Sequence, residues 1–262
     1  MLFSGSRQLR LAGILSALAL VGCGGGPKHN PPGGTGGTGG TNGYASFSWD
    51  IYDATATTIL PCAQVGAAKV VVTLFPEPSG TPAYKQDAVS CAAGEISTSY
   101  VPAGSYWVQL DLYGDPAIYG NADTPLDSFS LADSSGTPLV FPLGPGFNDY
   151  RGSTGAFVVR SFLVGWSVYV SSVLSSCAAV GATYVDLDFA VGSSSAWVTS
   201  RFACATGEGA SYAIPYGETT AQWRLYLVDA AGNDIPPAAA LGGTVGVSAT
   251  ADVGLGTQIF SF

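Results

Sequence analysis

Two stretches of the sequence decide the fold because they repeat one another: Cys62-Ala-Gln-Val-Gly-Ala-Ala-Lys-Val70 and Cys177-Ala-Ala-Val-Gly-Ala-Thr-Tyr-Val185. Further along, Cys91-Ala-Ala-Gly94 matches Cys204-Ala-Thr-Gly207, and Val101-Pro-Ala-Gly104 matches Ile214-Pro-Tyr-Gly217. A tryptophan-containing segment precedes each set, at residues 47–51 and 164–168. The same features recur in the same order at an offset of 113 to 117 residues, which indicates an internal duplication.

The four cysteines of the repeats are spaced alike. Cys62 and Cys91 are 29 residues apart, and Cys177 and Cys204 are 27 apart. We therefore expect one disulfide within each repeat, formed in an oxidising compartment. A four-cysteine metal site is the alternative, but the sequence contains no Cys-x-x-Cys and no histidine near these cysteines. The disulfides are the favoured interpretation.

The composition and the apolar pattern both favour β-structure. Of the 262 residues, 47% are apolar and only 10% are charged, which is too apolar for a disordered chain. Apolar residues alternate with polar ones at 47–51, 70–74 and 185–189, with prolines and glycines between such runs. The sequence predicts an all-β protein of two tandem antiparallel β-sandwich repeats, at residues 44–152 and 153–262.

One segment of the first repeat resembles a known kind of sandwich. Val101-Pro-Ala-Gly-Ser-Tyr-Trp-Val-Gln-Leu110 is similar to the strand entry of prealbumin-like domains, as in collagen-adhesin B-type repeats and carboxypeptidase regulatory-like modules. There a Pro-Ala-Gly turn leads into a strand with a buried aromatic residue, which the resemblance places at Tyr106. The second repeat departs from this pattern, with Thr219 in place of Tyr106. The cysteine pair is similar instead to repeated two-cysteine modules of bacterial surface lipoproteins.

The N-terminus has the features of a targeting segment. Arg7 and Arg10 precede an apolar stretch at residues 11–21, which is too short to span a bilayer. The stretch ends in Leu20-Val-Gly-Cys23, which resembles the lipobox of bacterial lipoproteins. The resemblance implies that residues 1–22 are a removable signal peptide and that Cys23 becomes lipidated. An ordinary secretory signal with an incidental cysteine is the alternative.

Residues 23–43 are expected to form a flexible linker. The tract at 24–43 contains 10 glycines, 3 prolines and no large apolar side chain, so burial cannot offset the entropy of ordering it. As a random coil its reach is about 25 Å. The residue after Cys23 is Gly24 rather than the aspartate that retains such proteins in the inner membrane, so the resemblance implies the outer membrane. We expect a cell-envelope protein held to the membrane by its N-terminal lipid.

Charge and residue usage argue against several classes of function. The formal net charge is −9, and it becomes −11 without residues 1–22, which hold two of the nine basic residues and no acidic one. Such acidity argues against nucleic acid as a partner. The only histidine, His29, lies in the linker, and no Gly-x-Ser-x-Gly motif occurs, so a histidine-dependent nucleophilic triad is excluded. We expect no enzyme activity and no cofactor.

Carboxylates give two weaker candidate sites. Asp186 and Asp188 are two apart on one expected strand, so they share a face and could serve a carboxylate-dependent hydrolase. We expect a solvated strand face there instead. The first repeat also has an insertion between residues 114 and 151, where Asp115, Asp123 and Asp127 are weak candidate metal ligands. Because aspartates are ordinary turn residues, a loop without metal is the favoured interpretation.

Aromatic residues that are out of phase with their apolar neighbours give the remaining candidate site. Four of them are predicted to face outward and could stack on sugars or anchor a protein: Tyr84, Trp107, Tyr113 and Trp197. Half-burial under a loop or against the other repeat is the favoured interpretation. Three other tryptophans are in phase with apolar neighbours and are expected in the cores: Trp49, Trp166 and, by alignment with Leu110, Trp223.

The sequence therefore supports a leading hypothesis and two alternatives. The leading one is a lipid-anchored envelope lipoprotein with a non-catalytic structural or protein-binding role. A carbohydrate-binding surface lipoprotein that uses the outward aromatics is the second. A metal- or carboxylate-dependent hydrolase is the least favoured. The predicted partners are the membrane, through the lipid, and an envelope protein or polysaccharide.

Overall fold

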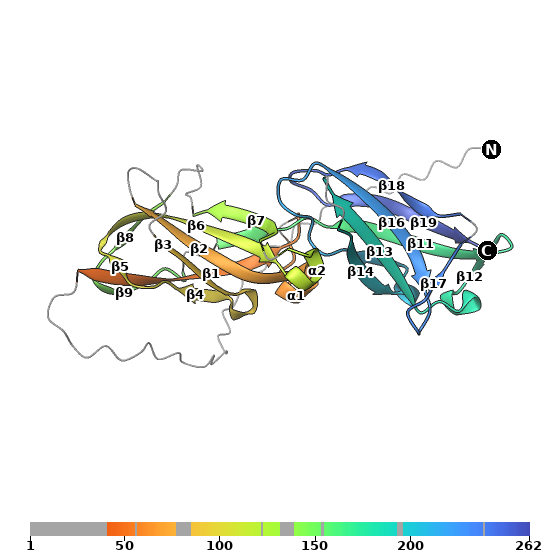
Figure 1. Ribbon diagram of the computed structural model, residues 1–262, viewed down its shortest axis with the longest axis horizontal. Helices are drawn as coiled ribbons and strands as arrows, with labels where there is room; N and C mark the ends of the chain where they lie inside the picture. Colours follow the sequence, from red (N-terminus) through yellow and green to blue (C-terminus); the bar gives the residue numbers. More distant parts are fainter. Residues whose placement is uncertain are drawn as a thin grey trace, which may run out of the picture. The chain divides into compact units, whose positions relative to one another are not determined.

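The computed structural model describes residues 41–262, except residues 56, 77–84, 122, 132–138, 153–154, 193–195 and 238. The predicted signal peptide, Cys23, residues 24–40 of the linker and Tyr84 lie outside the described residues. The described chain folds into two β-sandwiches with a few short helical turns (Figure 1), which confirms the predicted fold class. Within these residues, no helix is both long enough and apolar enough to cross a membrane.

The first sandwich is built from two sheets. In one sheet the central strand β1 (Asn42–Tyr52) pairs with β4 (Glu95–Ser97), β5 (Val101–Pro102), β9 (Gly146–Asp149) and β10 (Gly155–Val158). The other sheet has the order β3 (Lys85–Ser90), β2 (Ala67–Pro76), β6 (Gly104–Gly114), β7 (Pro125–Ser130), and β8 (Val140–Leu143) also pairs with β6. The helical turns are α1 (Cys62–Val65), η1 (Cys91–Ala93) and α2 (Pro116–Tyr119).

The second sandwich repeats this plan. In one sheet the central strand β11 (Phe162–Val170) pairs with β12 (Val173–Ser175), β15 (Glu208–Ala210) and β19 (Val253–Ser261). The other sheet has the order β14 (Val198–Ala203), β13 (Tyr184–Val191), β16 (Thr220–Val228), β17 (Asp234–Ile235), and β18 (Leu241–Gly246) also pairs with β16. The helical turns are η2 (Cys177–Val180) and η3 (Cys204–Thr206).

Equivalent contacts in the two sandwiches bear out the duplication. The backbone N–H of Trp49 donates to the carbonyl of Gly94, and that of Trp166 donates to the carbonyl of Gly207. Each repeat carries the expected disulfide, with an S–S distance of 2.06 Å in the first and 2.04 Å in the second. The register between the central strands also agrees, because Val72 lies opposite Leu110 and Leu187 lies opposite Leu225.

That register corrects one detail of the sequence alignment. Leu225, not Trp223, occupies the position of Leu110, because the offset on β16 is 115 residues. Trp223 still points toward the core with Leu225, but it is only partly buried. Trp49 and Trp166 are buried, as expected from their phase, and so is Tyr106, whose hydroxyl donates to the carbonyl of Pro102 at 2.8 Å.

Two further features were not anticipated from the sequence. The first strand of each sandwich has parallel partners: β9 and β10 run parallel to β1, and β19 runs parallel to β11. Parallel neighbours require a long crossover, and here the rest of each sandwich supplies it. In addition, β1 begins at Asn42, within the predicted linker, and β10 pairs with β1 although it follows the predicted boundary at residue 152.

The connection from β10 to β11 is hydrogen-bonded on both sides. Asp127 accepts the N–H of Val158 at 2.7 Å, and Asp252 accepts the N–H of Ser161 at 2.7 Å. Between them, the buried Arg160 donates to two backbone carbonyls of the second sandwich. The buried hydroxyl of Tyr119, on α2, donates to one carbonyl of each sandwich. The chain is thus held at this junction by specific polar contacts.

Candidate ligand-binding face

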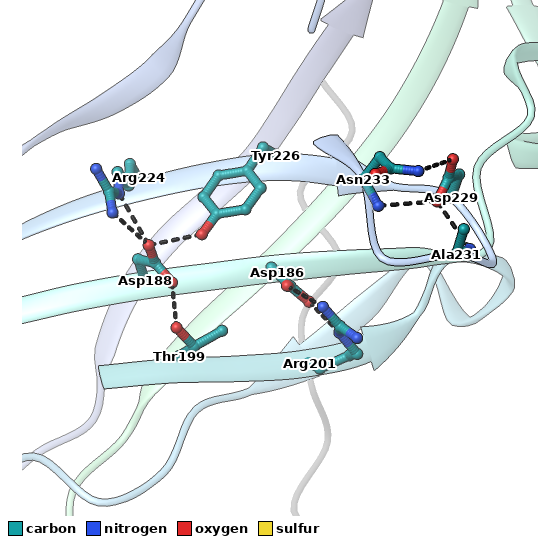
Figure 2. A network of polar contacts seen from close by, with 9 residues as sticks. All are labelled: Asp186, Asp188, Thr199, Arg201, Arg224, Tyr226, Asp229, Ala231 and Asn233. Carbon is teal, nitrogen blue, oxygen red and sulfur yellow. Dashed lines mark hydrogen bonds and ion pairs between the residues drawn. The ribbon is translucent and has the colours of Figure 1, made fainter. Parts of the chain in front are cut away.

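The outward side of three neighbouring strands in the second sandwich carries a polar network (Figure 2). Asp186 and Asp188 both project from β13, because residues two apart on a strand share a face. Arg201 on β14 and Tyr226 on β16 lie opposite Asp186. Thr199 on β14 and Arg224 on β16 lie opposite Asp188. We refer to these six residues, with Trp197 and Tyr184, as the polar face.

The expectation that the two aspartates form a solvated face is wrong. Asp186 is only 4% exposed and Asp188 only 2%. Longer side chains on the flanking strands cover the carboxylates, and each carboxylate is satisfied by hydrogen bonds, as burial of a charge requires. For Asp186 the partner is Arg201, whose Nε donates to Oδ1 at 2.8 Å and whose Nη2 donates to Oδ2 at 2.7 Å.

Asp188 is held by three side chains at once (Figure 2). Its Oδ2 accepts from the Nε of Arg224 at 2.9 Å and from the hydroxyl of Tyr226 at 2.6 Å. Its Oδ1 accepts from the hydroxyl of Thr199 at 2.6 Å. Burial, and then this hydrogen bond to Asp188, raise the pKa of Tyr226, so the phenol is a fixed neutral donor. The hydrogen bonds to Asp186 likewise raise the pKa of Arg201.

The arginines present their outer sides to solvent. Their side chains are about half exposed, at 48% for Arg201 and 50% for Arg224. The guanidinium carbon of Arg224 lies 4.2 Å from the ring centroid of Trp197, and that of Arg201 lies 5.2 Å from the centroid of Tyr184. Cation–π contacts of this kind, together with the ion pairs, fix two planar cations on the surface.

The first sandwich shows that the scaffold does not require these charges. Its residues at the positions of Asp186 and Arg201 are Val71 and Ala88, which also lie opposite each other. At the positions of Asp188 and Arg224 it has Thr73 and Gln109, again opposite each other. At these positions the same strands therefore pack without charged side chains in one copy and with two buried carboxylates in the other.

The arrangement suits binding better than proton transfer. A general acid or base needs a carboxylate oxygen that can reach a substrate proton. Both aspartates are covered, and all of their oxygens already accept hydrogen bonds from the polar face. What the face offers to solvent is guanidinium N–H donors and aromatic surface.

The nearby turn in Figure 2 has a local role. Asp229 accepts the N–H groups of Ala231 and Asn233, each at 2.8 Å, and the Asn233 side-chain amide at 3.0 Å. The bonds from Asn233 lower the pKa of this exposed carboxyl. Aspartate in this position closes the turn between β16 and β17.

The four predicted outward aromatics do not form one site. Trp107 and Tyr113 lie on the outer face of β6, as their phase predicted, and both are half-buried. Six residues of strand separate them, which corresponds to about 20 Å. Lys69 lies over the ring of Tyr113 at 4.9 Å. Trp197 belongs to the polar face of the other sandwich, beneath Arg224, and Tyr84 lies outside the described residues.

The three aspartates of the insertion are likewise dispersed. Asp115 caps α2 by accepting the N–H of Ala117, Asp123 pairs with Lys69 at 2.9 Å, and Asp127 accepts from Val158. Burial raises the pKa of Asp127. In the part of the chain that the structure describes, no three acidic, histidine or cysteine side chains are grouped as metal ligands would be.

Sequence reasoning missed Arg201, Arg224 and Tyr226. The available signal was their phase: each lies at an outward position of a strand whose inward positions are apolar. Their partners could not be chosen from the sequence, since Arg201 is 15 residues from Asp186 and Arg224 is 36 residues from Asp188.

Comparisons with known proteins do not assign the chain to a family. No protein-family model matches the sequence, and no curated protein matches it. Three solved structures are similar in part. A leucine-rich repeat protein from Bacteroides thetaiotaomicron is 12% identical, with a TM-score of 0.27; the match covers 85% of this chain and only 27% of that one.

The other two are adhesins. The C-terminal fragment of the pilus adhesin SpaC from Lactobacillus rhamnosus GG is 12% identical, with a TM-score of 0.24, and 78% of this chain and 83% of that chain are covered. An adhesin from Mobiluncus mulieris, with intramolecular disulfide, isopeptide and ester cross-links, is 10% identical, with a TM-score of 0.26 and coverage of 85% and 99%. At such identities and scores the likenesses carry no functional conclusion.

Proposed function

We propose that the protein is a lipid-anchored lipoprotein of the cell envelope with a non-catalytic, partner-binding role. In this proposal residues 1–22 are the signal peptide, Cys23 carries the lipid, and residues 23–43 are a tether to the two sandwiches. The lipobox-like Leu20-Val-Gly-Cys23 and the glycine-rich tract support the anchor. The two disulfides support an oxidising compartment, and the outer membrane is the proposed location.

The polar face is the single observation on which the binding role rests. One copy of a duplicated scaffold carries two buried aspartates that hold arginines at the surface, and the other copy does without them. Replacing a buried ion pair with apolar residues is often neutral or stabilising, so stability alone is a weak reason to keep one. Fixed arginines beside Trp197 and Tyr184 are instead the residue types that dominate protein interfaces.

A protein partner is favoured by the charge balance of the face. Two aspartates and two arginines cancel, so the polar face would not attract a polyanion over a distance. Carbohydrate is the second candidate, favoured by the contact between Arg224 and Trp197. An arginine fixed beside an indole can donate to ring hydroxyls while aromatic surface packs on the sugar. Trp107 and Tyr113 remain candidate contacts of the first sandwich.

The test uses the matching residues of the first sandwich as replacements. Residues 24–262, secreted through an unrelated signal and oxidised, are incubated with envelope fragments and with insoluble polysaccharides, and co-sedimentation is measured. The graft variant Asp186→Val, Arg201→Ala, Asp188→Thr, Arg224→Gln keeps residues that this scaffold already accepts. The control, Asp149→Asn with Arg151→Gln, removes an exposed ion pair of the first sandwich.

Each outcome bears on a different part of the proposal. Capture by envelope that is lost after protease treatment, and lost in the graft variant but not in the control, supports a protein partner at the polar face. Capture by one polysaccharide, competed by its soluble sugar, supports the carbohydrate alternative. Capture that the graft leaves unchanged refutes the polar face as the site.

A further inference from the structure

An exposed aromatic cluster lies at the end of the first sandwich where β1 begins. The ring of Tyr44 lies 4.9 Å from that of Tyr100 and 5.2 Å from that of Phe147, measured between centroids. Tyr100 is 61% exposed and Phe147 50% exposed. We call these three residues the aromatic end. Groups of exposed rings on a soluble domain mark interaction surfaces more often than isolated ones do.

Three chain segments form this end, and no charged residue occurs in the part of each segment that surrounds the rings. Strand pairing joins Asn42 to Pro102 and Gly43 to Gly146, and β5, β8 and β9 gather where β1 begins (Figure 1). Residues 41–46, 98–104 and 142–148 contain no Asp, Glu, Lys, Arg or His. In a chain with a net charge of −9, this end is therefore set apart from the acidic remainder.

Among the described residues, the carboxylates of Asp149 and Asp87 lie beside these segments, and both accept hydrogen bonds. Asp149 follows Asn148 on β9 and accepts from the Nε of Arg151 at 2.8 Å. Asp87 accepts from the N–H of Ser99 at 2.8 Å and from its hydroxyl at 2.7 Å. The prolines beside the cluster, Pro102 and Pro145, are exposed as well. An uncharged surface of phenol, phenyl and proline side chains fits a boundary between water and an apolar phase, where tyrosine is enriched.

The second sandwich shows that exposed rings are not a requirement of this scaffold. Its residue at the position of Tyr100 is Ala213, which is fully buried and whose carbonyl accepts from the hydroxyl of Tyr119 in the first sandwich. In the second copy this position is therefore in contact with the first sandwich. In the first copy the same end carries rings that reach solvent.

The aromatic end lies close in sequence to Cys23, the proposed site of the lipid. Strand β1, which carries Tyr44, begins at Asn42, 19 residues after Cys23. A random coil of that length spans about 25 Å, so a lipid on Cys23 would hold the aromatic end within reach of the bilayer surface.

We infer that the aromatic end docks on the headgroup region of the bilayer and forms a second membrane contact beside the lipid. This inference rests on the lipid anchor of the proposed function. Tyr44, Tyr100 and Phe147 would sit at the level of the headgroups, with no charged group of the three segments forced into that layer. The polar face belongs to the other sandwich and takes no part in this contact.

The experiment places a fluorescent reporter at this end in the full chain. The protein is produced in a bacterium that lipidates such signals and is reconstituted in vesicles of phosphatidylcholine with brominated acyl chains. Tyr100→Trp puts an indole in the aromatic end. Tyr216→Trp is the matched control, because Tyr216 is an exposed tyrosine (55%) of the second sandwich. Flotation reports anchoring, and quenching of the added emission reports contact with lipid.

We expect both variants to float, with at least half of the added emission quenched for Tyr100→Trp and none for Tyr216→Trp. Adding Tyr44→Ser and Phe147→Ser to Tyr100→Trp should remove the quenching while flotation persists. Flotation without quenching at position 100 overturns the inference and leaves the anchor intact. If lipid does not quench the indole at position 100 but envelope protein shifts its emission spectrum, the inference is also overturned, in favour of a protein partner. Failure to float refutes the lipid anchor itself, and with it the inference.

Discussion

The polar face predicts that Arg224→Ala destabilises the protein far more than removal of the whole ion pair. Truncating Arg224 leaves Asp188 only 2% exposed and dependent on Thr199 and Tyr226 for hydrogen bonds. Removing one partner of a buried pair costs about 3–5 kcal/mol. The Arg224 side chain is 50% exposed, so water can replace it in part, and we expect a loss of about 2–3 kcal/mol.

The comparison variant is Asp188→Thr with Arg224→Gln, which installs the residues that the first sandwich has at these positions, Thr73 and Gln109. Because the variant leaves no unpaired charge at this site, the free energy of unfolding should remain within about 1 kcal/mol of the original. Urea unfolding followed by tryptophan fluorescence measures both changes. In a thermal scan of a chain of this size, the single substitution should lower the Tm by about 5–10 °C.

Two results would refute the reasoning. If Arg224→Ala changed the free energy of unfolding by less than about 0.5 kcal/mol, the ion pair would behave as an ordinary surface pair. If the double variant were as unstable as the single one, the loss would come from the arginine's packing on Trp197 rather than from an unpaired carboxylate. The substitution Trp197→Ala separates these contributions, since it removes the stacking and leaves both charges.

Three further predictions concern other parts of the molecule. Replacing Cys177 and Cys204 together with alanine should cost about 3.5 kcal/mol, because the unfolded second repeat regains the entropy of a loop of this length; urea unfolding of the oxidised protein measures it. Tyr119→Phe removes the hydroxyl that joins a carbonyl of each sandwich, so we expect a loss of about 1–2 kcal/mol and faster amide exchange near that junction, with no change at the polar face. Burial raises the pKa of Asp127, so the ionised carboxylate is disfavoured in the folded state. The contribution of Asp127 to stability is therefore greatest below its pKa in the unfolded chain, and it is lost as the pH rises through its pKa in the folded protein. Asp127→Asn should therefore raise the Tm relative to the original protein more at pH 7 than at pH 4, and an equal shift at both would contradict this assignment.

The architecture could be predicted from the sequence because it depends on two short-range signals, the alternation of apolar residues along a strand and the spacing of the cysteines within each repeat. Alternation placed Phe47, Trp49 and Ile51 in one core, and all three are buried. Cysteine spacing within each repeat led to the two disulfides that the structure contains. The parallel pairing of β1 with β10 joins residues about a hundred positions apart, and no short-range pattern encodes such a contact.

Sites were harder to predict than strands because they depend on register across strands. Phase alone placed Asp186 and Asp188 on one outward face, yet their burial follows from arginines contributed by two other strands. The aromatic end shows the same limit, since Tyr44, Tyr100 and Phe147 come from three separate segments. Trp107 and Tyr113 lie on the outer face of β6 and Trp197 lies on the other sandwich, and phase alone does not say which aromatic residues share a surface.

A duplicated scaffold provides its own reference for separating fold from function. Positions at which both copies carry the same kind of residue, such as the paired cysteines and the tryptophans of β1 and β11, are explained by packing that both copies need. Where the two copies carry different kinds of residue, packing of the shared scaffold does not require either one. Asp186 and Asp188 with their arginines in the second copy are such positions, and so is the exposed ring of Tyr100 in the first, where the second copy has the buried Ala213. Since each carries a burial or exposure cost that the other copy avoids, these two places are where a role beyond folding should be sought.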